Sequence, residues 1–116
     1  MNSEELDLDP NMVRLVAVLN ECPGIYTFSS CGGHASPSPG QAPEGEFNVC
    51  FSVAPSGGGW RSLEVILSAC GAEAKIVAWW AADDHLPGAV AFQLEGRGEA
   101  TPDRIADAIE QAISPT

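Results

Sequence analysis

Residues 47–53 read FNVCFSV, and this stretch decides the fold. Its odd positions hold Phe or Val, whereas its even positions hold Asn, Cys or Ser. Successive side chains of a β-strand point to opposite faces of a sheet, so this alternation predicts a strand with one buried face. The pattern ends before Pro55, which cannot donate a hydrogen bond to a neighbouring strand.

Residues 90–95, VAFQLE, repeat this alternation later in the chain. Two strands with one apolar face each bury those faces against a common layer, so we predict that their apolar side chains share one sheet face. The predicted set is Phe47, Val49, Phe51, Val53, Val90, Phe92 and Leu94. We expect the opposite face, with Asn48, Ser52 and Gln93, to be more polar, and a second copy of the chain in a homodimer to cover the part that the first helix leaves open.

Three other segments have apolar residues at helical spacing. The first begins with Asp9 as the predicted cap and Pro10 in the first turn, and it ends at Pro23 and Gly24. The second covers residues 60–70, with a predicted apolar face of Trp60, Leu63, Ile66, Leu67 and Cys70. The third begins after the cap Thr101, with Ile105, Ile109, Ala112 and Ile113 on one face.

Short strands are predicted at residues 25–29 and 74–81, and the glycines at 57–59 are expected to form a flexible turn. Residues 30–45, rich in Pro, Gly and Ser, are expected to form a long structureless loop of the kind that is often functional. The resulting order, α-β-β-α-β-β-α, lacks a repeated strand–helix–strand unit. We therefore predict an α+β fold in which residues 9–116 form a single domain, with a four-stranded, mostly antiparallel sheet and three helices. Residues 1–8 are expected to be a flexible acidic terminus.

The chain of 116 residues carries 5 basic and 16 acidic side chains, a formal net charge of −11. This field repels phosphate backbones, so we expect no direct binding of nucleic acid. No apolar run is long enough to span a bilayer, and the acidic start resembles no secretory signal, so we expect a cytoplasmic protein without membrane contact. Its four scattered cysteines are expected to be reduced.

The segment Ser29-Ser30-Cys31-Gly32-Gly33-His34 has the most unusual chemistry in the sequence. Its glycines could turn backbone N–H groups toward the carboxylate or phosphate of a small ligand, because no Lys or Arg lies between residues 14 and 61. Alternatively, Cys31 and His34 could bind a metal together with His85, or Cys31 could be a nucleophile with His34 as its base. A plain turn with a buried cysteine is the simplest interpretation.

Two further features could contribute to a ligand site. Trp79 and Trp80 are adjacent on a predicted strand, so one ring could be exposed and stack on a nucleobase-like ligand, or both could be buried. His85 lies in the segment DDHLPG, which is typical of a turn.

The run LVAVLNECPGIYTFSSCGGH, residues 15–34, resembles the start of the wybutosine-synthesising tRNA methyltransferase family, whose Ser-Ser-Cys-x-Gly-Arg loop is largely reproduced by residues 29–33. The later segments GEFNVCFSV and WRSLEVILSACGA are similar to the next strand and helix of that family. His34 stands where the family has arginine, and this chain is shorter and less basic. The resemblance implies a pocket at residues 29–34, S-adenosylmethionine as a cofactor, and a small nucleoside-like ligand. A non-catalytic interaction domain on the same scaffold is the alternative, and the substrate is not indicated.

Overall fold

The computed structural model describes residues 9–39, 41–70, 74–79 and 90–113, without the side chains of Trp79 and Val90. Four predictions fall outside these residues: the flexible terminus at 1–8, the helix stop at Gly71, the position of Trp80, and the turn that carries His85. In the described residues the order α-β-β-α-β-β-α is confirmed, as a single α+β domain.

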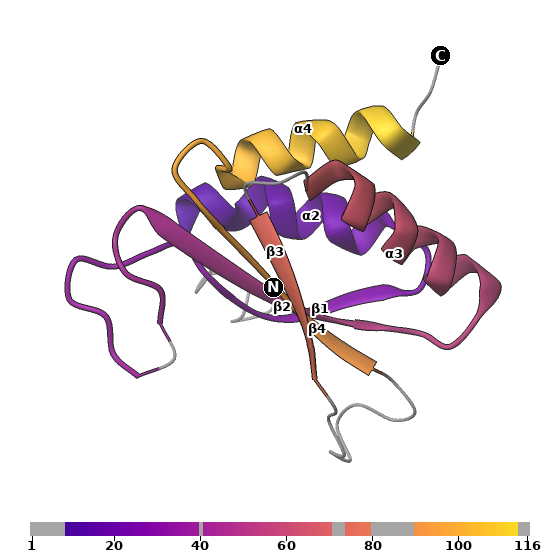
Figure 1. Ribbon diagram of the computed structural model, residues 1–116, viewed down its shortest axis with the longest axis horizontal. Coiled ribbons are helices and arrows are strands. Elements are labelled where there is room, and N and C mark those ends of the chain that lie inside the picture. Colours follow the sequence, from indigo (N-terminus) through magenta and orange to yellow (C-terminus); the bar gives the residue numbers. More distant parts are fainter. Residues whose placement is uncertain (1–8, 40, 71–73, 80–89, 114–116) are drawn as a thin grey trace.

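The four strands form one antiparallel sheet in the order β1-β2-β4-β3 (Figure 1). The strands are β1 (Ile25–Cys31), β2 (Glu46–Val53), β3 (Ala74–Trp79) and β4 (Val90–Arg97). Strand β1 extends two residues beyond its predicted end, which makes Cys31 its last residue. Ser30 and Cys31, which were predicted to begin the loop at residues 30–45, thus belong to the sheet.

The apolar face that the two central strands were predicted to share is confirmed for the side chains that the structure describes. Phe51 pairs with Phe92 across β2 and β4, and their ring centroids lie 5.8 Å apart. The odd-numbered side chains of β2 are buried in the hydrophobic core, together with Leu94 of β4. The alternation of apolar and polar residues therefore specified which face carries the hydrophobic core, although Cys50 and Ser52 on the opposite face are buried as well.

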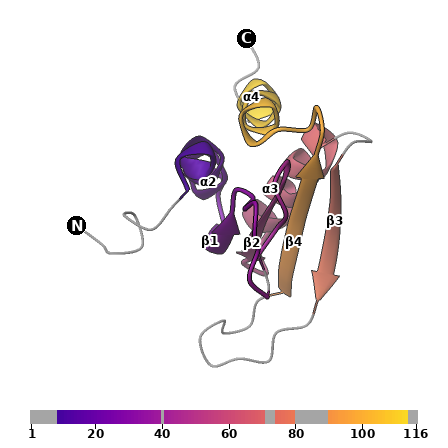
Figure 2. The same ribbon diagram turned by 90° about the vertical axis from the view of Figure 1, so that its left-hand side faces the viewer.

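The helices all lie on that apolar face, so the molecule has two layers (Figures 1 and 2). A short 3-10 turn, η1 (Pro10–Met12), leads into α2 (Val13–Glu21), and α3 (Gly57–Cys70) and α4 (Pro102–Ile113) complete the layer. Met12, Leu15 and Leu19 of the first segment are fully buried in this core. Within the described ranges, no helix has the length and apolar character needed to cross a membrane.

Helix α3 differs from the prediction in both its start and its buried face. The glycines at 57–59 form its first turn, not a flexible turn, because the Ser56 hydroxyl accepts a hydrogen bond from the N–H of Gly59 at 3.1 Å. A Cβ at Gly59 would lie 2.2 Å from the carbonyl oxygen of Ala54, so the helix starts at very close range to the preceding segment. The small residues Gly59 and Ser62 face the core, which leaves Trp60 and Leu67 about half exposed.

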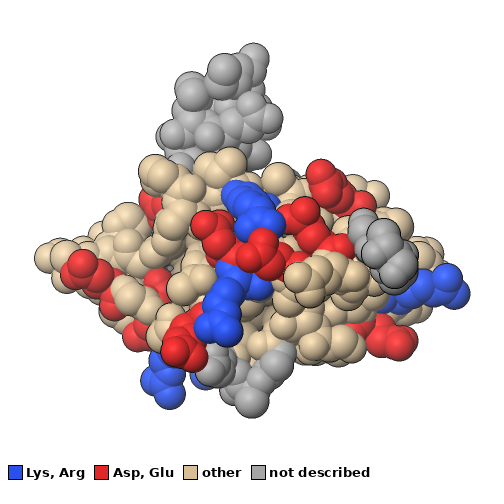
Figure 3. Space-filling model, turned by 90° about the horizontal axis from the view of Figure 1, so that it is seen from above, with Lys and Arg blue, Asp and Glu red and all other residues tan. Residues whose placement is uncertain are grey.

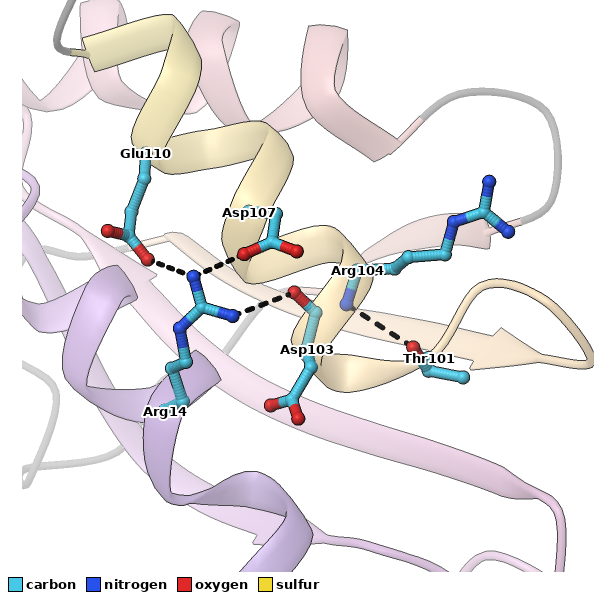
Figure 4. A network of polar contacts seen from close by, with 6 residues as sticks. All are labelled: Arg14, Thr101, Asp103, Arg104, Asp107 and Glu110. Atoms are coloured by element: carbon cyan, nitrogen blue, oxygen red, sulfur yellow. Dashed lines mark hydrogen bonds and ion pairs between the residues drawn. The ribbon is translucent and has the colours of Figure 1, made fainter.

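Helix α4 begins as predicted, since the Thr101 hydroxyl accepts a hydrogen bond from the N–H of Arg104 (Figure 4). Its last turn does not follow the predicted apolar face, because Ala112 and Ile113 are exposed. Arg14 joins α2 to α4 by contacting the carboxylates of Asp107 and Glu110, as Figure 4 shows. These contacts favour the charged guanidinium and raise the pKa of Arg14.

Candidate metal site at the end of strand β1

The segment singled out in the sequence lies at the end of β1, where the edge strand leaves the sheet. A register shift between Thr27 and Ser29 interrupts the ladder with β2 just before it. Ser29 is exposed and Ser30 half-buried, whereas Cys31 is buried with 6% of its surface accessible. Of these three residues, only Cys31 is therefore shielded from solvent.

The loop that follows is ordered by its own backbone, contrary to the prediction of a structureless loop. His34 donates its N–H to the carbonyl oxygen of Ala42 at 2.9 Å and forms a β-bridge with Pro43. Gly33 has φ +100°, in the region that favours glycine, and a Cβ there would lie 2.6 Å from the carbonyl oxygen of Glu46. The second glycine is thus required by the packing of the loop itself.

The side chain of Asp9 does not cap the first helix, contrary to the prediction. It contacts this loop instead. Its Oδ2 accepts a hydrogen bond from the N–H of Gly32 at 2.7 Å, and Asn11 Nδ2 donates to the carbonyl oxygen of Gly32 at 3.0 Å. The N–H of Gly32, one of the two glycine donors that the sequence suggested for an external anion, is therefore bonded within the chain. A carboxylate of the protein itself occupies the predicted anion position.

The same arrangement brings together three potential metal ligands. One ligand atom each from Asp9, Cys31 and His34 lies within 4.8 Å of the other two. His34 Nε2 is 3.6 Å from Asp9 Oδ2, and both side chains are about one-third exposed. The Sγ atom of Cys31 accepts a hydrogen bond from the N–H of Ala42 at 3.3 Å, so the loop also orients the sulfur.

The other cysteines lie apart from this cluster. All four are free thiols, and burial raises the pKa of Cys22, Cys50 and Cys70, the last to about 11. Among the described residues, the cluster of potential metal ligands includes none of these three sulfurs.

The structure therefore brings together part of the predicted site and adds Asp9 to it. Cys31 and His34 converge as expected, whereas the third proposed ligand, His85, and the stacking residue Trp80 lie outside the described residues. For Trp79 the structure gives the strand position but no side chain. Asp9 carried no signal of this role, because an aspartate before a proline at a helix start is typical of a cap.

Comparison with known proteins adds no family assignment. No protein-family model, no curated protein and no solved structure matches the chain. The relation to the wybutosine-synthesising enzymes stays a prediction from the sequence.

Proposed function

We propose that this protein binds a divalent transition metal ion, with Zn²⁺ as the best fit, through Asp9, Cys31 and His34. The observation that carries the proposal is the convergence of a carboxylate, a thiol and an imidazole from two distant parts of the chain within 4.8 Å. Zn²⁺ accepts this mixture of oxygen, sulfur and nitrogen donors, whereas Ca²⁺ and Mg²⁺ favour oxygen alone.

The spacing of the ligand atoms is close to that of a bound site. Tetrahedral coordination with ordinary Zn–ligand bond lengths separates neighbouring ligand atoms by about 3.3 to 3.6 Å. The separation of 3.6 Å between His34 Nε2 and Asp9 Oδ2 already matches this value. To reach this spacing for all three ligand atoms, the side chains need to move by less than about 1.5 Å. Two of them, Asp9 and His34, are partly exposed.

Electrostatics and neighbouring groups also support a cation. A thiolate and a carboxylate balance the charge of a divalent ion, and the net charge of −11 attracts cations to the molecule. The bonds from Gly32 to Asp9 and from Ala42 to Cys31 are outer contacts of the kind that orient metal ligands. With three protein ligands and partial exposure, the fourth coordination position is available to water or a small ligand.

Replacement of Zn²⁺ by Co²⁺ tests the proposal with a direct spectroscopic signal. Co²⁺ bound to a thiolate gives a sulfur-to-metal charge-transfer band in the near ultraviolet. We expect this band in the wild type with a stoichiometry of one ion per chain, and its loss in Cys31→Ser. The matched control is Cys50→Ser, because Cys50 is also buried but bonds Gln93 at the centre of the sheet.

Thermal unfolding provides a second measurement, in which Zn²⁺ is compared with S-adenosylmethionine. Zn²⁺ at 100 times its dissociation constant raises the free energy of unfolding by about 2.7 kcal/mol if it binds only the folded state. Asp9→Asn and His34→Gln should each lose most of this gain. A shift with S-adenosylmethionine but not with Zn²⁺ would contradict metal binding and support the methyltransferase-like function that the sequence resemblance implies.

A further inference from the structure

The sulfur atom of Cys31 differs from the other cysteine sulfurs in its hydrogen bonds. It accepts the N–H of Ala42 at 3.3 Å, whereas the thiols of Cys22 and Cys50 donate to oxygen atoms at 3.5 and 3.4 Å. Burial raises the pKa of Cys70 to about 11, which favours its thiol form. A hydrogen bond donated to sulfur favours the thiolate, so the surroundings of Cys31 suit a sulfur anion better than those of the other three cysteines.

A metal ion at the site of Asp9, Cys31 and His34 would hold this sulfur as the thiolate. Metal ions displace the proton of a cysteine ligand, and the thiolate is also the form that peroxides oxidise. In this cluster, one sulfur is thus both a metal ligand and the target of an oxidant. Sensitivity to oxidation at Cys31 therefore rests on the proposed function, metal binding.

Solvent reaches the metal-ligand cluster along two of its three side chains. Asp9 and His34 are each about one-third exposed, although Cys31 itself is buried. With three protein ligands, the fourth coordination position of Zn²⁺ is left for a small molecule. Because hydrogen peroxide has only two heavy atoms, we expect it to enter where a larger oxidant is excluded.

The strand register places no cysteine of the sheet within disulfide distance of Cys31. Cys31 pairs with Asn48 across β1 and β2, so Cys50 is its diagonal neighbour. Diagonal neighbours lie about 7 to 8 Å apart, too far for a disulfide unless the backbone moves. Cys22 and Cys70 belong to the hydrophobic core, which does not include Cys31. Oxidised Cys31 is thus expected to stay a sulfenic acid.

From these observations we propose that Cys31 is a peroxide-sensitive ligand whose oxidation releases the metal ion. The thiolate attacks one oxygen of hydrogen peroxide, so that an S–O bond forms, the O–O bond breaks and hydroxide leaves. The sulfur loses two electrons and the peroxide gains them. The product is a neutral sulfenic acid, which leaves Asp9 and His34 as the remaining charged and imidazole ligands.

Loss of the thiolate should weaken metal binding strongly. Removal of an outer contact of a metal ligand typically costs about 10- to 100-fold in affinity, and loss of a ligand should cost more than this. Two molecules of a small thiol reverse the oxidation. The first forms a mixed disulfide with Cys31 and water, and the second regenerates the Cys31 thiol and forms a disulfide of the reductant.

Release of Zn²⁺ from the loaded full chain tests the proposal. A chromophoric chelator measures free Zn²⁺ after hydrogen peroxide is added, and mass spectrometry with a sulfenic-acid trap locates the added oxygen. We expect one ion to be released for each oxygen atom added at Cys31. Addition of a thiol in excess should then restore binding of Zn²⁺.

Two variants separate oxidation of Cys31 from other effects of peroxide. Aspartate also binds Zn²⁺ but is not oxidised, so Cys31→Asp should keep its ion in peroxide. If this variant binds no ion, the position of the added oxygen in the wild type decides the question. Cys50→Ser is the matched control and should release Zn²⁺ as the wild type does, because Cys50 is not in the cluster.

The possible results distinguish this proposal from metal binding itself. Retention of Zn²⁺ by the wild type in peroxide would overturn the proposal and leave metal binding at Cys31 in place. Release from Cys31→Asp, or release with the oxygen at another residue, would do the same. A chain that binds no Zn²⁺ before peroxide is added would overturn both proposals.

Discussion

At the scale of single residues, Gly33 determines whether the loop that carries the candidate site can form. Replacing Gly33 by Ala adds backbone strain at φ +100° and a contact of 2.6 Å with the carbonyl oxygen of Glu46. We expect the free energy of unfolding to fall by about 2 to 3 kcal/mol in urea titrations.

Gly45 in the same loop offers a matched control. It also has a positive φ, +87°, but a Cβ there would meet no atom within 4 Å. Gly45→Ala should therefore cost only the conformational strain, about 1 kcal/mol. Equal losses for the two variants would show that the carbonyl of Glu46 moves aside and that the close packing at Gly33 does not limit stability.

The candidate site shows how far residue types and spacing can predict chemistry. Cys31 and His34 were identified because a thiol and an imidazole three residues apart can bind one ion. The role of Asp9 was missed because it depends on contacts across 22 residues or more of sequence, which no local pattern records. The glycines were assigned to an external anion, whereas the structure uses the N–H of Gly32 to hold that same aspartate.

At the scale of elements, the start of α3 depends on a side-chain cap that compensates for three glycines. Each glycine in a helix costs up to about 1 kcal/mol relative to alanine, so the first turn is intrinsically unstable. Ser56→Ala removes the acceptor for the Gly59 N–H and should lower the free energy of unfolding by about 1 kcal/mol. Urea titrations monitored by circular dichroism measure this change.

A conservative variant at the same position provides the control. Ser56→Asp keeps an acceptor and adds a negative charge at the helix N-terminus, so it should retain or raise the stability. Ser68→Ala, at an exposed position later in α3, should have little effect. A loss for Ser56→Asp as large as that for Ser56→Ala would show that the cap does not stabilise this turn.

The elements also separate what the sequence could predict from what it could not. The buried faces of β2 and β4 were predictable because their alternation of apolar and polar side chains places Phe51 and Phe92 on the same side of the sheet. The buried face of α3 was not predictable in this way, because the helical spacing of the large apolar side chains placed Trp60 and Leu67 on it. Close approach of the backbone at Gly59 places small residues against the core, and small residues carry little hydrophobic signal.

At the scale of the whole molecule, few basic side chains are available to an external anion. Of the five, Arg14 contacts Asp107 and Glu110, Lys75 contacts Glu95 at 3.2 Å, and Arg104 lies 3.7 Å from Glu99. Figure 3 shows acidic side chains directly beside basic ones on the helical face. The remaining two are Arg61 on α3 and Arg97 at the end of β4.

This distribution predicts that the isolated chain does not bind RNA. Affinity for a phosphate backbone grows with the number of cations that replace counterions. Two arginines on different elements, which form no ion pair within the described part of the chain, replace few of them. We expect no binding of tRNA in filter assays at about 50 mM salt, where electrostatic attraction is least screened. Bound Zn²⁺ should not change this result, because a thiolate and a carboxylate neutralise its charge. Submicromolar binding that weakens steeply with salt would contradict the argument and would require a basic surface that Arg61 and Arg97 alone do not provide.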